Sequence, residues 1–275
     1  MTAFFHHLAY DFRTGLRDKT QMLMFYLFPL FFYAMMGLLM GKVNPGFLAT
    51  MIPAMIVFAG MSSTLLALPG PVVSARENGV YRSFRINGVP AMNIVLIPML
   101  GTILHMAVCA AIITLTAAPL FGAARPLPGR ELAGVGVFLA TSFCLAALGM
   151  LIGVISPNTR ATVLYGQALY LPSIMLSGMM IPLDMLPKGL IPAALLFPGT
   201  HSMEAFRGAV MGLPTMVSPL LALLALLASG AIALGLAIYL FDWDSRPTGK
   251  PRAKALAALA LLPFVVLAAG NWLSM

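Results

Sequence analysis

Residues 74–90 read SARENGVYRSFRINGVP and form one of the few charged islands between two long apolar segments. Asn87-Gly88 followed by Pro90 is typical of a helix end. If residues 79–86 are helical, apolar and aromatic side chains share one face and polar side chains share the other. The first face holds Val80, Tyr81 and Phe84, and the second holds Asn78, Arg82 and Arg85. The pattern predicts a short helix outside the bilayer core, docked on another protein or on a lipid headgroup layer.

The composition of the whole chain is typical of a membrane protein. Of its 275 residues, 60% are hydrophobic and 9% are charged, and the mean hydropathy is +0.96. These values lie far outside the range of soluble globular domains. The net charge of +8 comes from basic residues in loops between apolar segments, where such residues set the membrane orientation. We therefore expect a polytopic, all-α membrane protein with no nucleic-acid partner.

Seven apolar segments are long enough to cross a membrane. At ~1.5 Å per residue, a helix of about twenty residues crosses a hydrocarbon core of ~30 Å. The sequence therefore predicts a helix bundle of six core transmembrane helices and a seventh one at the C-terminal end. The predicted spans are 21–41, 48–70, 93–118, 132–155, 162–181, 217–240 and 255–273.

Two regions outside these spans are also apolar. Residues 3–17 carry apolar side chains three and four positions apart, which predicts an amphipathic helix in the membrane interface. These side chains are Phe5, Leu8, Phe12 and Leu16. Residues 182–216 are too apolar for an ordinary loop and too rich in proline for one span, so we expect two short re-entrant helices in the outer leaflet, sheltered by protein. The predicted order is 1–20 amphipathic helix, 21–241 transmembrane domain, 242–254 cytoplasmic linker and 255–275 C-terminal helix.

The distribution of Lys and Arg predicts the orientation in the membrane. With the N-terminus in the cytoplasm, the inner side has eleven basic residues and the outer side has five. The inner ones are Arg13, Arg17, Lys19, Arg76, Arg82, Arg85, Arg160, Arg246, Lys250, Arg252 and Lys254, and the outer ones are Lys42, Arg125, Arg130, Lys188 and Arg207. This bias places residues 74–90 in the cytoplasm, and the seventh span places the C-terminus outside.

Two motifs resemble a known family. Glu77-x-Gly79, an aromatic or apolar run, a basic residue and Gly88-Val89-Pro90 resemble the first cytoplasmic loop of ABC-2 type transporter permeases. Residues 176–187, LSGMMIPLDMLP, are similar to the family's Ser-Gly-x-x-x-Pro-x-x-x-x-Pro segment at the outer end of the fifth helix. With the helix spacing, the resemblance covers residues 1–245. It implies the N-terminal interfacial helix and the re-entrant outer helices, whereas a seventh span departs from the family's common core of six.

The resemblance implies the permease subunit of an ATP-driven exporter in a bacterial cytoplasmic (inner) membrane. The chain has no Gly-x-x-x-x-Gly-Lys-Ser/Thr phosphate loop, because Pro251 follows Thr248-Gly249-Lys250 where a hydroxyl is needed. The chain would therefore be no enzyme, and ATP-Mg would bind to two copies of a separate ATPase, beside a second permease copy or homologue. The expected ATPase-coupling residues are Glu77, Val80, Tyr81, Arg82, Phe84 and Arg85. The alternative is a basic loop that touches only lipid headgroups.

Polar side chains within the spans are candidates for a substrate path. The fifth predicted span carries Gln167, Tyr170, Ser173 and Ser177, and its last three polar residues share one stripe. This stripe would line a cavity between two permease halves, but hydroxyl groups also hold membrane helices together, and we favour that packing role. His105 is the ionisable side chain clearly inside a span. A neutral, hydrogen-bonded histidine between helices is favoured over a proton relay, because a relay needs several such groups.

The spans offer little to pair with a strongly charged solute, so the expected substrate is amphipathic or hydrophobic. Drug-like molecules are favoured, and lipid, glycan or haem-type export within the same class is an alternative. An ion-coupled or facilitative transporter without an ATPase, and a membrane scaffold, are the rival functions. No metal site is expected, because Cys109 and Cys144 lie in apolar segments and the histidines lack ligand spacing. Membrane lipids are expected to contact the spans.

Overall fold

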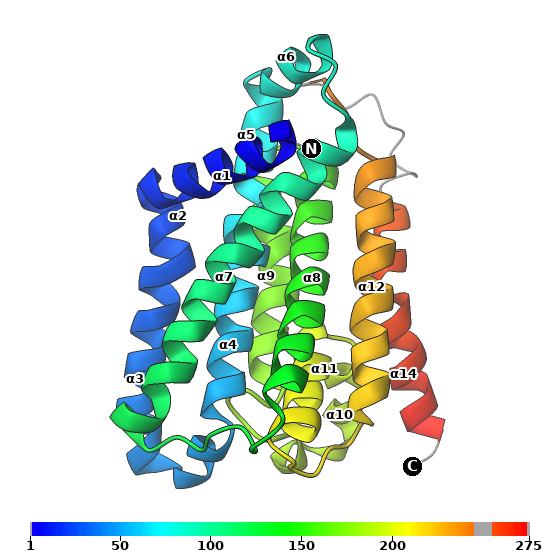
Figure 1. Ribbon diagram of the computed structural model, residues 1–275. Coiled ribbons are helices and arrows are strands. Elements are labelled where there is room, and N and C mark those ends of the chain that lie inside the picture. Colours follow the sequence, from blue (N-terminus) through cyan, green and yellow to red (C-terminus); the bar gives the residue numbers. More distant parts are fainter. Residues whose placement is uncertain (1, 245–254, 274–275) are drawn as a thin grey trace.

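The computed structural model describes residues 2–244 and 255–273, and the described residues form helices and connecting loops with no β-strand. Helix α1 (Thr2–Arg17) lies across one end of a bundle of long helices (Figure 1). Asp18 ends α1 and caps the next helix, since its carboxylate accepts a hydrogen bond of 2.9 Å from the backbone N–H of Gln21. The chain then turns into the bundle.

The bundle contains continuous helices made of several shorter segments. The first joins α2 (Lys19–Met22), a π-helical turn (Leu23–Leu27) and α3 (Phe28–Val43), and the second joins α4 (Met51–Met61), a π-helical turn (Ser62–Ala67) and α5 (Pro69–Glu77). The others are α7 (Ala91–Phe121), α8 (Glu131–Ile155), α9 (Thr159–Leu176) and α12 (Pro219–Tyr239). Every residue of α4 is buried, so the second helix is the centre of the bundle.

Among the residues that the structure describes, five helices are long and apolar enough to cross a membrane, which confirms the predicted polytopic helical fold. They are Lys19–Val43, Met51–Glu77, Ala91–Phe121, Glu131–Ile155 and Pro219–Tyr239. Helix α9 is shorter than the predicted span 162–181, because Gly178 has a left-handed φ of 81° and the helix stops at Leu176. The C-terminal segment is a shorter apolar helix, Leu256–Gly270. Whether these two segments cross the membrane therefore stays a prediction.

The connection between α9 and α12 consists of short helices at the end of the bundle opposite α1 (Figure 1). They are α10 (Ile191–Ala194), α11 (Pro198–Ala205) and the π-helical turn Phe206–Val210. All eight residues of α11 are buried, including Glu204, whose carboxylate accepts hydrogen bonds from the backbone N–H groups of Met216 (2.5 Å) and Val217 (3.0 Å). Short helices sheltered by protein are thus present where they were predicted.

The C-terminal segment, a 3₁₀ turn (Leu256–Leu261) followed by α14 (Leu262–Leu273), packs against α12 and α10. The Ser229 hydroxyl of α12 donates a hydrogen bond of 2.7 Å to the Ala260 carbonyl oxygen. The fully buried ring of Phe264 stacks on His201 of α11, with 4.9 Å between ring centroids. The segment is therefore an integral part of the bundle. Most of the predicted linker 242–254 lies outside the described residues.

Glycine allows the closest helix contacts in the bundle. Helix α8 passes the π-helical turn at Gly149, where a β-carbon would meet the backbone carbonyl oxygen of Thr64. One turn later, a β-carbon on Gly153 would lie 2.9 Å from that of Val72. Since a backbone carbonyl within a helix cannot move aside easily, a side chain at Gly149 requires the two helices to separate.

We therefore expect Gly149→Ala to destabilise the protein by about 2 kcal/mol or more, in the range of overpacked cores. The measurement is the free energy of unfolding in mixed detergent micelles. Gly136→Ala on the same helix is the matched control, because a β-carbon there meets nothing within 4 Å. That control should be neutral or stabilising by up to about 1 kcal/mol. Equal stability of the two variants would contradict the packing role of Gly149.

Candidate functional site

Helix α6 (Val80–Ile86) lies beyond the end of the bundle, on the same side as α1 (Figure 1). Gly79 separates it from α5 with a left-handed φ of 73°, and Gly88 ends the turn after it with a φ of 72°. The short helix predicted from residues 79–86 is therefore confirmed. The six predicted coupling residues all lie on α6 or on the last residue of α5, which is the exposed Glu77.

The aromatic face of α6 packs on its own chain. Tyr81 is 4% exposed, and its ring lies 5.2 Å from the ring of Phe241, just after α12. Phe84 is half-buried, with its ring 5.6 Å from the His7 ring of α1. Burial raises the pKa of the Tyr81 hydroxyl above its usual value. These two side chains therefore anchor α6 to the rest of the chain.

The opposite face of α6 is open. Arg85 is exposed and Ile86 is 81% exposed, whereas Val80 is 41% exposed and lies with Tyr81 and Phe84 on the inner face of the helix. Arg82 forms an ion pair of 2.9 Å with Asp244, beyond α12, and both side chains are largely exposed. Such a pair contributes little to stability, but it joins α6 to the chain that follows α12.

A buried arginine connects the α5–α6 unit to a second part of the bundle. Arg76, near the end of α5, is 2% exposed. Its guanidinium donates a hydrogen bond of 2.9 Å to the Val154 carbonyl oxygen and a second one to the Ser156 carbonyl oxygen. These carbonyls belong to the C-terminal end of α8, where a cation is favoured by the helix dipole. The sequence pattern placed Arg76 only among the orienting charges and missed this contact.

The polar stripe of α9 lies inside the protein. Tyr170, Ser173 and Ser177 are buried, and their hydroxyl groups have no hydrogen-bond partner among the described residues. A β-carbon on Gly199 of α11 would lie 3.2 to 3.3 Å from those of the two serines. This close approach fits the packing role. Gln167 lies apart from them and lines a separate cavity, so a substrate path formed by these residues stays a prediction.

His105 joins α7 to two other helices. Its Nδ1 is 2.7 Å from the hydroxyl of Tyr26, and its ring is stacked between Phe12 of α1 (4.3 Å) and Phe25 (4.7 Å). Gly15 of α1 packs against the same imidazole. This geometry is that of a histidine that holds helices together, whereas a role in the substrate path stays a prediction.

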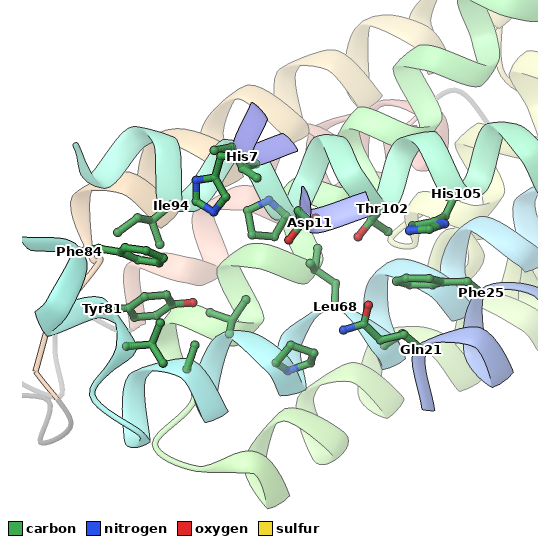
Figure 2. A pocket seen from close by; sticks show the side chains of 17 residues that line it. His7, Asp11, Gln21, Phe25, Leu68, Tyr81, Phe84, Ile94, Thr102 and His105 are labelled. Atoms are coloured by element: carbon green, nitrogen blue, oxygen red, sulfur yellow. The ribbon is translucent and has the colours of Figure 1, made fainter. Parts of the chain in front are cut away.

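A cavity of about 180 Å³ lies between α1, α5, α6 and α7 (Figure 2). Its polar lining includes His7, Asp11, Gln21, Tyr81, Thr102 and His105. Burial raises the pKa of the Asp11 carboxyl above its usual value, and the nearby His7 opposes part of this effect. A second cavity of about 340 Å³ adjoins it, since Gln21, Ala67 and Pro71 line both. Sequence periodicity predicted the helix α1 but gave Asp11 no role, and it missed the cavity.

The long apolar helices and the interfacial helix define a multi-pass helical membrane protein. Comparison with protein families then identifies the kind of transporter, because the family model described as ABC-2 type transporter matches residues 2–211. The chain belongs to the ABC-2 type transporter family, and its helical bundle is a transport component, the membrane domain of an ABC permease. No curated protein sequence is significantly similar to the chain.

Proposed function

We propose that the chain is the permease subunit of an ATP-driven exporter of amphipathic or hydrophobic molecules, with drug-like molecules favoured. Two permease subunits, identical or homologous, would work with two copies of an ATPase that binds ATP-Mg. The observation that supports this most is α6, which extends beyond the bundle and is fastened to α1 and to the segment that follows α12. A helix in this position is suited to receive mechanical work from a soluble partner.

The contacts of α6 suggest how such work is transmitted. We expect the ATPase to bind the open face, with Ile86 and Arg85, because Tyr81 and Phe84 are occupied within the chain. Movement of α6 would reach α1 through Phe84, the end of α12 through Tyr81, and α8 through Arg76 of the preceding helix. Closure of the ATPase pair would then rock these helices and open a path to the outside.

The proposed orientation places α1 and α6 in the cytoplasm of a cell with this protein in its cytoplasmic membrane. It follows from the excess of basic residues at that end of the bundle. In this orientation the short helices α10 and α11 lie at the outer surface. The C-terminus lies outside as well if α14 and the preceding turn cross the membrane.

ATP dependence tests this function against an ion-coupled transporter. The full chain would be purified from its native membrane together with any bound ATPase, reconstituted into vesicles, and supplied with an amphipathic fluorescent dye. We expect dye flux that requires ATP-Mg and stops with a non-hydrolysable analogue. Flux driven by a proton gradient without ATP would support the ion-coupled alternative, and no flux with the ATPase bound would support a scaffold.

A further inference from the structure

The cavity beneath α1 contains a carboxylate without a salt bridge. Asp11 is half-buried, and within the described part of the chain no hydrogen bond or salt bridge reaches its carboxylate, although His7 is near enough to lower its pKa. Figure 2 shows it between His7 and Thr102, with Tyr81 and Phe84 at one end of the cavity and Phe25 and His105 at the other. A carboxylate in an apolar setting is costly unless a donor or a cation is supplied. The cavity is large enough to hold that partner.

We propose that this cavity binds the protonated amine of an amphipathic molecule, with Asp11 as its counter-ion. The proposal goes beyond ATP-driven export and does not depend on it, because binding is a property of this chain alone. The amine nitrogen would donate hydrogen bonds to the Asp11 carboxylate. The apolar body would occupy the remaining space.

The lining of the cavity selects a cation over an anion. Among the residues that the structure describes, no lysine or arginine lines it. Three aromatic rings do so, those of Phe25, Tyr81 and Phe84, and the face of such a ring attracts an ammonium group. Tyr81 directs its hydroxyl towards the middle of the cavity (Figure 2). An anionic headgroup would meet the Asp11 carboxylate and no lysine or arginine.

Glycine positions the carboxylate. The Asp11 side chain lies against α7 at Gly101, so close that a β-carbon at this residue would collide with its Oδ2. Because Gly101 has no side chain, the Asp11 carboxylate has room to lie against α7 and to face the cavity. An alanine at this position is expected to displace the carboxylate without changing any charge.

The location of the cavity suits a ligand that arrives from the membrane. The exposed surface of α1 carries Phe5 (63%) and Tyr10 (69%) beside charged residues such as Arg13, as expected for a helix in the membrane interface. The cavity lies behind this helix. The adjoining cavity, which is lined by Met24, Leu66 and Val163, offers an apolar extension for an alkyl or aryl chain.

The test compares an amine with an uncharged molecule of the same size. The full chain would be placed in nanodiscs of phosphatidylcholine and phosphatidylglycerol, which lack primary amines, and titrated with phenylbutylamine or phenylbutanol by calorimetry. We expect the amine to bind roughly tenfold or more tightly than the alcohol, since a charge-assisted hydrogen bond is lost with the alcohol. Equal binding of the two molecules would overturn the proposal.

Variants assign the binding to Asp11. Asp11→Asn keeps the shape of the side chain and should weaken amine binding about tenfold, with little change for the alcohol. Gly101→Ala should weaken it too, whereas Glu131→Gln, an exposed residue of α8 at the opposite end, should have no effect. Unchanged amine affinity in Asp11→Asn would overturn the proposal, and the alcohol titration shows whether that variant retains the cavity.

Nanodiscs of a second lipid composition show whether the natural amine is a lipid headgroup or a free amphipathic molecule. Phosphatidylethanolamine carries a protonated amine in its headgroup, whereas phosphatidylcholine does not. If the headgroup is the natural occupant, nanodiscs with phosphatidylethanolamine will weaken phenylbutylamine binding to the unmodified chain. If a free amphipathic amine is the occupant, binding will be unchanged. Either result supports the amine site and names its source.

Discussion

Replacing Ile86 by glutamate is expected to abolish ATP-driven transport and leave the bundle folded. The Ile86 side chain is 81% exposed at the end of α6, so the protein itself gains almost nothing from it. If the ATPase covers this residue, a carboxylate there must lose its water without a partner. We expect the ATPase to bind this variant at least about tenfold more weakly than the unmodified chain. The measurements are copurification and ATP-dependent dye flux in vesicles.

Leu132→Glu is the matched control for this variant. Leu132 is 83% exposed in the first turn of α8, at the opposite end of the bundle, so the change in charge and exposure is the same. Its flux and its bound ATPase should equal those of the unmodified chain. Normal transport by Ile86→Glu would show that the ATPase does not bind this face of α6. Loss of transport in both variants would indicate a general effect of the added charge.

Local sequence signals were sufficient for most of the described helices. Gly79 and Gly88 adopt left-handed φ values at the two ends of α6, and few other residues do so readily. Long apolar segments likewise predicted five helices that are able to span a membrane. The predicted fifth span was too long because the glycine of the Ser177-Gly178 pair ends α9, a turn signal that hydropathy alone does not reveal.

The partners of each face could not be predicted in the same way. Periodicity indicates that one side of α6 is covered, but it does not say whether the cover is an ATPase or the chain itself, and Tyr81 packs on Phe241. The same limit applies to Asp11, which the amphipathic pattern of α1 did not include. Its inward position depends on the missing side chain of Gly101, about ninety residues away in sequence. Such contacts require the three-dimensional arrangement.

Arg76→Met is expected to destabilise the protein by roughly 3 kcal/mol, because two charge-assisted hydrogen bonds are lost and the carbonyl oxygens of Val154 and Ser156 remain buried. Methionine fills a similar volume, so the loss reflects the missing donors more than a cavity. The measurement is the free energy of unfolding in mixed detergent micelles. Arg85→Met removes the same charge from the exposed face of α6 and should change stability by no more than about 0.5 kcal/mol.

Arg76→Lys distinguishes the geometry of the contact from its charge. Lysine keeps the cation near the C-terminal end of α8 but has a single nitrogen, which is not suited to reach both carbonyls as the planar guanidinium does. An intermediate loss of stability is therefore expected. If Arg76→Lys were as stable as the unmodified chain, the helix dipole and not the pair of hydrogen bonds would hold α5 to α8. If Arg76→Met were as stable as Arg85→Met, this contact would not fasten α5 to α8. Movement of α6 would then have to reach the bundle through the contacts of α6 itself, those of Tyr81, Phe84 and Arg82.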